Sequence, residues 1–399
     1  MYQAYKYRIY PNAEQKEALA RSFGCCRWYW NYALNLCQET YKATGKGLSR
    51  YAIQKLLPGL KQEYPWLSDA YSQCLQVVAL ILSTAYKNFF DKRAELPRFK
   101  SKHRRKSISY PQNVKFVGDY LKLERKVGLV YCRRHRDFEG EIKMVTISKN
   151  PDGKYYASVL VDDGRSQPDP SSEGKAVGID LGLTHFAITS DGSKHDNPRH
   201  FAKHQRNLRR KQKKLSRKTK RSKRRNKARL KVAKVHSKIS RCREDFLHKL
   251  SRKLVDENQV IAVENLNVKG MVRNHSLAKA ISDVGWRMFC TMLKYKAEKE
   301  GKIYIEVDRW LPSSKTCNHC LNVIDSLPLD IRFWDCQYCG VTNIDRDINA
   351  AKNIRDEALR ILSLGTSDTA KGGNVRHPGK TSVLSDAIPD ELGSHDRVR

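Results

Sequence analysis

The sequence predicts an α/β protein made of several domains. Three observations support this fold class. The chain has 399 residues, which is enough for about two to four compact units with cores of their own. Stretches with the two-residue hydrophobic period of strands alternate with stretches of helical periodicity. Two Cys-x-x-Cys pairs interrupt the last of these alternating regions, which indicates a small metal-holding insertion.

The first part of the chain is expected to form a strand followed by helices. Residues 1–10 alternate between apolar and polar side chains, which predicts a strand. A first helix is expected after residue 11 and should end near Phe23, within a helical unit that spans residues 11–113. The end of this unit, residues 100–109, is expected to be a basic connector.

A small β unit and a linker follow. Residues 114–166 carry short alternating runs between Asp-Gly and Asn-Pro turns, which predict strands joined by tight connections. Residues 167–174 are rich in Pro, Ser, Asp and Glu. We therefore expect a domain boundary in this linker.

The rest of the chain predicts an α/β domain with an insertion. The domain is expected over residues 175–312, interrupted at 313–342 and completed by a last helix at 343–362. Its expected elements are a hairpin, a basic pair of helices, a strand, an amphipathic helix and a second strand, over residues 176–190, 203–250, 260–263, 276–300 and 303–307. Residues 363–399 are dominated by Gly, Ser, Pro and Asp, and we expect a disordered tail.

Three acidic side chains stand at informative places in this domain. Asp180 lies within an otherwise apolar strand, and Glu264 follows the apolar run Val-Ile-Ala-Val. Asp347 lies in the first turn of the last helix, with Asp345 available as its N-cap. A buried carboxylate costs several kcal/mol unless a cation or hydrogen bonds compensate for it.

Each acid also has a purely structural explanation. Asp180 could cap a turn or form an ion pair, Glu264 could mark the end of a strand, and Asp347 could favour the helix dipole. Together, however, they follow the order in which a ribonuclease H-like fold brings three carboxylates to one point. Such a cluster requires divalent cations, Mg²⁺ or Mn²⁺. Two of these ions can activate water and stabilise the leaving oxygen of a phosphodiester, so the acids predict hydrolytic strand cleavage.

The four cysteines of the insertion predict a structural zinc ribbon. Cys317 and Cys320 are separated from Cys336 and Cys339 by fifteen residues, a typical ligand spacing. Four incidental thiols are the alternative. Because all four ligands would come from the protein, the zinc would have no open position and no catalytic role. His319 is expected to be a bystander, and the seven scattered cysteines fit reduced thiols in a cytosol.

The charge predicts a polyanionic partner. Lys and Arg outnumber Asp and Glu by 77 to 42, which gives a net charge of +35. Nucleic acid fits this excess better than an anionic membrane surface or a ribosomal scaffold. Residues 203–231 are predicted to form a phosphate-tracking helical hairpin, with a solvated face or a localisation signal as alternatives. The aromatic residues 27–32 could serve core packing or base stacking. No apolar run suits a membrane span or a secretory signal, so no membrane partner is expected.

Five segments, in this order along residues 1–360, carry a family resemblance. They are Tyr7-Arg-Ile-Tyr-Pro-Asn, Val177-Gly-Ile-Asp-Leu-Gly-Leu, Val263-Glu-Asn-Leu-Asn-Val-Lys-Gly, Ser313-Ser-Lys-Thr-Cys-Asn-His-Cys and Asp345-Arg-Asp-Ile-Asn-Ala-Ala-Lys-Asn-Ile. This set resembles the TnpB (OrfB) family of insertion-sequence proteins, relatives and expected ancestors of the type V CRISPR effectors.

The resemblance implies an RNA-guided DNA endonuclease with a particular domain plan. A wedge β unit, residues 1–10 and 114–166, would be split around a helical recognition lobe at 11–113. A RuvC nuclease domain would cover 175–312 and the helix at 343–362, with the zinc ribbon inserted between them.

The resemblance also implies the site and the partners. The family's catalytic acids, which bind Mg²⁺ or Mn²⁺, fall on Asp180, Glu264 and Asp347. The expected partners are a guide RNA encoded near the gene and a double-stranded DNA target. A monomer is expected in a prokaryotic cytoplasm, associated with the nucleoid when in use. One departure is Leu321, where the family usually has Gly, so the first half of the zinc site is expected to differ slightly.

The alternative function is a DNA-binding transposase, or an accessory or regulatory transposition protein without guided cleavage. Relaxase-type transposases need a His-x-His pair, and none of the twelve histidines has this spacing. Transposases with an Asp-Asp-Glu triad usually place the Glu last, whereas the order here is Asp, Glu, Asp. A regulatory relative would be expected to lose one of the acids, and this chain keeps all three.

Overall fold

The structure, a computed structural model, describes residues 1–370 apart from residues 104, 125 and 329. The chain forms two compact units, the first over Met1–Arg165 and the second beginning at Ser166. The boundary lies next to the linker expected at residues 167–174. Among the described helices, none is long and apolar enough to cross a membrane.

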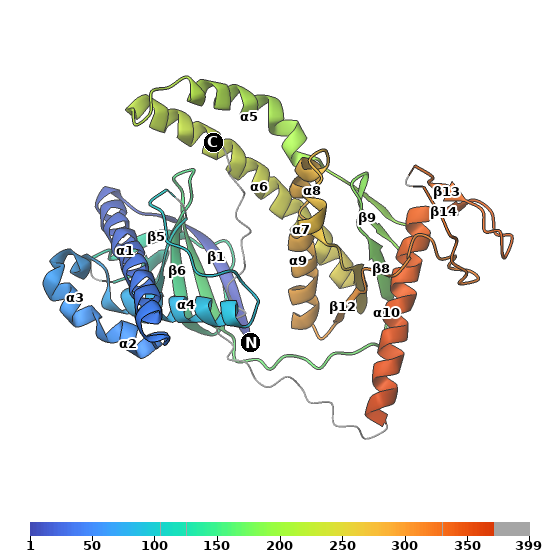
Figure 1. The fold of residues 1–399 in the computed structure, drawn as a ribbon, viewed down its shortest axis with the longest axis horizontal. Coiled ribbons are helices and arrows are strands. Elements are labelled where there is room, and N and C mark those ends of the chain that lie inside the picture. Colours follow the sequence, from blue (N-terminus) through green and yellow to red (C-terminus); the bar gives the residue numbers. More distant parts are fainter. Residues whose placement is uncertain (104, 125, 329, 371–399) are drawn as a thin grey trace. The chain divides into compact units, whose positions relative to one another are not determined.

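The first unit is built on a seven-stranded sheet with the order β2-β6-β7-β1-β5-β4-β3. The strands are β1 (Tyr2–Tyr10), β2 (Lys106–Tyr110), β3 (Lys115–Val117), β4 (Tyr120–Lys122), β5 (Leu129–Arg133), β6 (Glu141–Lys149) and β7 (Tyr155–Asp162). The first strand of the chain lies in the middle of this sheet, antiparallel to both β5 and β7. Figure 1 shows this unit in blue to green. The alternation of residues 1–10 is explained by this position, because Tyr7 and Ile9 point into the core.

The helices of the first unit lie between β1 and β2 in the chain. They are α1 (Ala13–Thr44), α2 (Arg50–Lys55), α3 (Leu57–Glu63) and α4 (Ser72–Phe90), with a 3-10 turn at Pro65–Asp69. The expected helix end near Phe23 is wrong, because α1 continues for 32 residues from a capping box at Asn12 to Gly45. An internal Gly24 costs only about 1 kcal/mol, and the buried residues on either side of it outweigh that cost.

The expected end of the helical unit at residue 113 is also wrong. Lys106–Tyr110 forms the edge strand β2, which pairs antiparallel with β6. Ile108 and Tyr110 of this strand are buried. The basic residues that precede the strand obscured its short alternating pattern, which covers only five positions.

The second unit contains a five-stranded sheet with the order β10-β9-β8-β11-β12. The strands are β8 (Ala176–Asp180), β9 (His185–Thr189), β10 (Lys194–Asp196), β11 (Val260–Glu264) and β12 (Ile303–Val307). β8, β9 and β10 form an antiparallel meander, and β8, β11 and β12 are parallel. Asp180 is the last residue of β8 and does not lie within the strand as expected.

The basic region forms the expected helical hairpin. Its arms are α5 (His200–Ser216) and α6 (Lys223–Glu257). Leu208, Val235 and Ile239 form a small buried seam between the arms. Most cationic side chains between residues 203 and 241 are exposed to solvent, whereas Arg243, further along α6, is paired with Asp283 at 2.9 Å.

The expected helix over residues 276–300 is interrupted. A short α7 (Val268–Met271) precedes α8 (Ala278–Val284) and α9 (Trp286–Lys299), and the last two are separated by Gly285 at a φ of +77°. The left-handed backbone at this glycine ends one helix and starts the next. The apolar stripe expected for the single helix continues along α9, where Trp286 and Phe289 are buried.

The last helix, α10 (Arg346–Ala370), packs on β8. It extends into the tail expected at residues 363–399, so the predicted start of that tail is wrong. The remainder, residues 371–399, lies outside the described residues. Between β12 and α10, the short strands β13 (Phe333–Trp334) and β14 (Ile344–Asp345) pair within the inserted segment.

Candidate active site and cysteine cluster

Asp180 and Glu264 end two neighbouring parallel strands. The register pairs Ile179 of β8 with Val263 of β11, and these are the residues directly before the two acids. Parallel strands of an α/β sheet end at a common edge, which is where such sheets bind their ligands. Both carboxylates therefore belong to the same edge of the sheet.

The third acid comes from α10, which crosses β8 at Gly178. A Cβ atom at this glycine would lie 2.0 Å from the carbonyl oxygen of Ala351, so only glycine permits the observed approach. Asp180 lies two residues further along β8, about 7 Å away. Asp347 lies four residues before Ala351, about 6 Å along the helix. Asp180 and Asp347 are thus at similar distances from the point where α10 crosses β8. These distances are consistent with both acids lying at the same edge of the sheet.

The electrostatics of Asp180 show that the other two acids lie close enough to influence it. Burial, followed by the negative charges of Glu264 and Asp347, raises the pKa of Asp180 to about 7, although Arg346 and a backbone N–H counteract this. Burial also raises the pKa of Glu264. A desolvated group of like charges favours either a proton or a cation.

Asp347 and Asp345 have different partners. Arg332 of the inserted segment donates from Nη1 to both carboxylate oxygens of Asp347, at 3.3 Å each. Asp345 accepts from the backbone N of Asp347 at 3.0 Å and of Ile348 at 3.1 Å, and from Nζ of Lys194 at 2.6 Å. Asp345 thus caps α10 as expected. Asp347 has one exposed guanidinium as its counter-charge.

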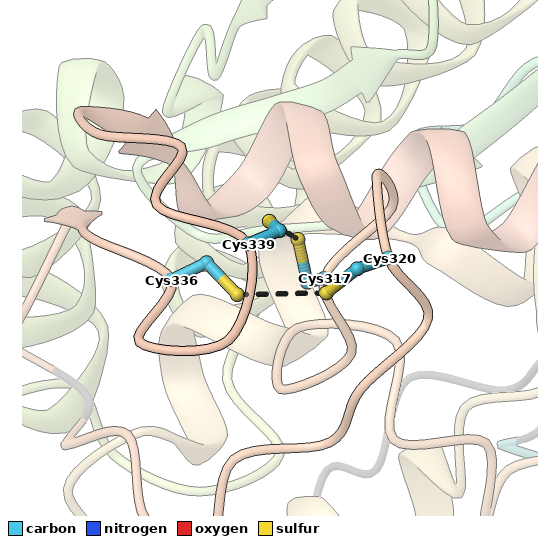
Figure 2. A group of neighbouring side chains, drawn as sticks. All are labelled: Cys317, Cys320, Cys336 and Cys339. Atoms are coloured by element: carbon cyan, nitrogen blue, oxygen red, sulfur yellow. Dashed lines mark hydrogen bonds between the residues drawn. The ribbon is translucent and has the colours of Figure 1, made fainter.

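The four inserted cysteines come together as a compact group (Figure 2). Their Sγ atoms all lie within 4.8 Å of one another, and no other set of three or more potential ligands in the described residues is as close. Cys317 and Cys339 are 3.8 Å apart, and Cys320 and Cys336 are 3.6 Å apart. A tetrahedron with metal–sulfur bonds of about 2.3 Å has edges of about 3.8 Å. The arrangement fits a structural zinc ion.

The two halves of this cluster have the same backbone geometry. In each half, the carbonyl of the first cysteine accepts an N–H from the residue after the second, Leu321 at 2.8 Å and Gly340 at 3.0 Å. Both residues are left-handed, with φ of +63° and +71°. The expected difference in the first half is therefore wrong. Leu321 adopts the glycine conformation at a cost of about 1–2 kcal/mol.

Two asparagines of α10, for which the sequence predicted no role, connect that helix and its Asp347 to the cysteine cluster. Asn349 and Asn353 are 4% and 6% exposed. Both donate to the carbonyl of Thr316 at 2.7 Å, and Oδ1 of Asn349 accepts from the backbone N of Asn318 at 2.9 Å. Their spacing of four residues, which places both on one face of the helix, was the available signal.

Three family models match parts of the chain. They are described as a probable transposase, at residues 158–275, a helix-turn-helix domain, at residues 1–46, and a Cas12f1-like TNB domain, at residues 286–354. The last of these includes the cysteine cluster. Residues 1–46 here form the strand β1 and the single helix α1.

Whole-chain comparison decides the family. A protein of Streptomyces pristinaespiralis named "Putative RNA-guided DNA endonuclease" is 38% identical over 385 residues, covering 95% of this chain and 93% of the relative. The chain belongs to the TnpB (OrfB) family. "Putative RNA-guided DNA endonuclease InsQ" of Escherichia coli (strain K12) is 32% identical over 91% of this chain and 94% of its own length.

A solved structure, the Cas12f1-sgRNA-target DNA complex, has a weaker similarity. Its TM-score is 0.48 at 13% sequence identity, covering 89% of this chain and 98% of that chain. A similarity at this level adds nothing to the family assignment, which the sequence relatives carry.

Proposed function

We propose that this protein is an RNA-guided DNA endonuclease that hydrolyses its target at a site formed by Asp180, Glu264 and Asp347. The main support is geometric, because Asp180 and Glu264 end neighbouring parallel strands and α10, which carries Asp347, crosses β8 at Gly178. Burial, followed by the charges of Glu264 and Asp347, also raises the pKa of Asp180. The names of the two whole-length relatives support the same activity. The order of the acids, Asp, Glu and Asp, favours a nuclease over an Asp-Asp-Glu transposase.

The domain plan is proposed on the same basis. We assign residues 175–312 and α10 to a RuvC domain, because the strand order places the Asp-bearing and Glu-bearing strands side by side. Residues 313–342 would be its zinc ribbon. The seven-stranded sheet would be the wedge unit, now including β2, and the helices α1 to α4 would be the recognition lobe.

The three carboxylates and the four cysteines would each hold a different metal, because oxygen and sulfur ligands prefer different ions. Mg²⁺ or Mn²⁺, held by the three carboxylates, would supply the activated water and the charge that stabilises the leaving oxygen. A bound cation would compensate for the burial that raises the pKa of Asp180 and Glu264. The four cysteines would hold zinc and, through Asn349 and Asn353, fix the start of α10. Asp347 would then reach its position because the cluster anchors its helix.

The partners follow from the charge and from the proposed activity. The basic hairpin of α5 and α6 would track phosphates without reading sequence. The nucleic acids would be a guide RNA encoded near the gene and a double-stranded DNA target. We propose that the protein acts as a monomer in the cytoplasm of a prokaryote, associated with the nucleoid.

The decisive experiment is co-expression of the chain with RNA from its own locus and an assay of guided cleavage on a library of target-flanking motifs. Asp180→Asn, Glu264→Gln and Asp347→Asn should each bind guide and target but fail to cleave. Asp245→Asn, which removes an exposed acid paired with Lys249 on α6, should cleave normally. Full cleavage by Asp180→Asn would contradict the site. Strand joining without a guide would favour the transposase alternative.

A further inference from the structure

A row of exposed tyrosines crosses the first unit's sheet. Tyr131 of β5 is the register partner of both Tyr10 on β1 and Tyr120 on β4, so the three side chains share one face. The ring centroids are 5.7 Å apart for Tyr10 and Tyr131, and 5.8 Å apart for Tyr120 and Tyr131. The three residues are 38%, 43% and 46% exposed. Val117 of β3 pairs with Tyr120 and extends the row across a fourth strand.

Folding of this unit does not explain the tyrosine row. The neighbours that point to the opposite face, Ile9, Leu121 and Cys132, are almost completely buried. The inner face of the sheet is therefore already filled. Single exposed apolar residues are common, but a contiguous exposed group marks a binding surface.

Cations lie on both sides of the row. On one side, Arg8 and Arg133 are register partners, and the guanidinium of Arg8 lies 4.6 Å from the ring centroid of Tyr10. On the other side, Lys115 and Lys122 are register partners. Residues two positions apart along a strand are separated by about 7 Å. The tyrosine row and the two flanking rows of cations occupy paired positions on β1, β3, β4 and β5. None of these positions holds an acidic residue.

We propose that the tyrosine row binds an unpaired stretch of RNA, with bases stacked on the rings and phosphates beside the flanking cations. Unpaired bases offer an aromatic face, and open sheets use exposed rings to stack them. A duplex has its bases stacked internally and would use only the cations. A second copy of this chain fits poorly, because a two-fold contact would place like-charged arginines and lysines together.

The choice of RNA rests on the proposed function. A guided nuclease holds its RNA before the target arrives, and the target arrives as a duplex. A single-stranded segment of the RNA is therefore the partner available to this surface. Its recognition through stacking would tolerate different bases, because every base has an aromatic face.

Binding of a short unstructured RNA of alternating adenosine and cytidine tests the proposal. The full chain would be compared with a triple variant that replaces Tyr10, Tyr120 and Tyr131 by Leu, and with the matching Phe variant. Tyr41→Leu, at a tyrosine on α1 that is 60% exposed, is the control. The measurements would be made at high salt, because salt weakens phosphate contacts elsewhere on the chain.

The Leu variant should bind at least about tenfold more weakly than the wild type, because base–aromatic stacking is lost. The Phe variant and the control should bind like the wild type. Ultraviolet cross-links to the wild type should map to peptides from β1, β4 and β5. Thermal unfolding would establish that each variant is folded.

A second variant keeps the test decisive if the Leu variant does not fold. Arg8→Gln with Arg133→Gln should lower the slope of log affinity against log salt by about 1.4, the value for two phosphates on a single strand. An unchanged slope would overturn the proposal, as would wild-type affinity in a folded Leu variant.

Two further results would point to another occupant and overturn the proposal. Tighter binding of DNA with the same sequence would assign the row to a displaced DNA strand. A dimer that the Leu variant loses would assign it to a second copy of the chain. Because these measurements involve no cleavage, a negative result leaves the nuclease proposal standing. An inactive nuclease would likewise leave the binding result interpretable.

Discussion

Gly178→Ala is expected to separate α10 from β8 and to disable cleavage. The new Cβ would lie 2.0 Å from the carbonyl oxygen of Ala351 and 2.5 Å from the backbone N of Arg355, where real contacts are essentially never below 3.0 Å. Neither backbone atom can rotate away, so the helix must withdraw by about 1 Å. Overpacking of this kind costs about 1–3 kcal/mol.

The displacement should affect activity more than stability. Asp347 lies one helical turn from the clash, so it would move away from Asp180 by a similar distance. A misplacement of about 1 Å can cost about 100-fold in rate. Single-turnover guided cleavage and thermal unfolding would be measured together. Cleavage at the wild-type rate, with an unchanged melting temperature, would refute the proposed helix contact.

Gly24→Ala is the matched control. A Cβ at this helical position meets no atom within 4 Å. The substitution should stabilise α1 by about 0.5–1 kcal/mol, because alanine loses less backbone entropy than glycine. Opposite effects from the same chemical change would isolate the role of the contact at Gly178.

Three further predictions concern the cluster, the counter-charge and a buried lysine. Leu321→Gly should stabilise the metal-loaded protein by about 1 kcal/mol, and Gly340→Ala should destabilise it by a similar amount. Calorimetric unfolding would measure both changes. Shifts in the same direction would contradict the strain assigned to Leu321. Arg332→Gln should tighten Mn²⁺ binding up to about fivefold, because the exposed guanidinium no longer competes with the cation for Asp347. Titration calorimetry would measure the affinity, and an unchanged value would contradict that competition. Burial lowers the pKa of Lys296 to about 8. Since the unfolded value is about 10.4, the unfolded state holds more protons between these values, and stability should rise with pH across that window. Lys296→Met should flatten this rise in urea unfolding, and an equal slope in both proteins would exclude the lysine as its source.

The sequence alone was sufficient to identify the family and the candidate metal ligands. Motif spacing along the chain is a local property, so four cysteines and three acids in a fixed order could be recognised without a fold. The helical hairpin and most strands followed from hydrophobic period. The catalytic roles of Asp180, Glu264 and Asp347 remain predictions.

Boundaries were less predictable where tertiary packing outweighs local preference. The first helix was expected to end near Phe23, yet α1 continues through Gly24, and buried residues lie on both sides of that glycine. The edge strand β2 is too short to be identified by period alone, and a basic segment precedes it. Its membership of the sheet depends on pairing with β6.

Only the tertiary structure decided which distant residues meet. Arg332 reaches Asp347 because β13 and β14 pair, and Gly178 matters because α10 crosses β8 at that point. The tyrosine row joins residues from three strands that are separated in the chain and have no common motif. Sequence period gives the face of each side chain, but strand register, which depends on pairing between distant segments, decides its neighbours.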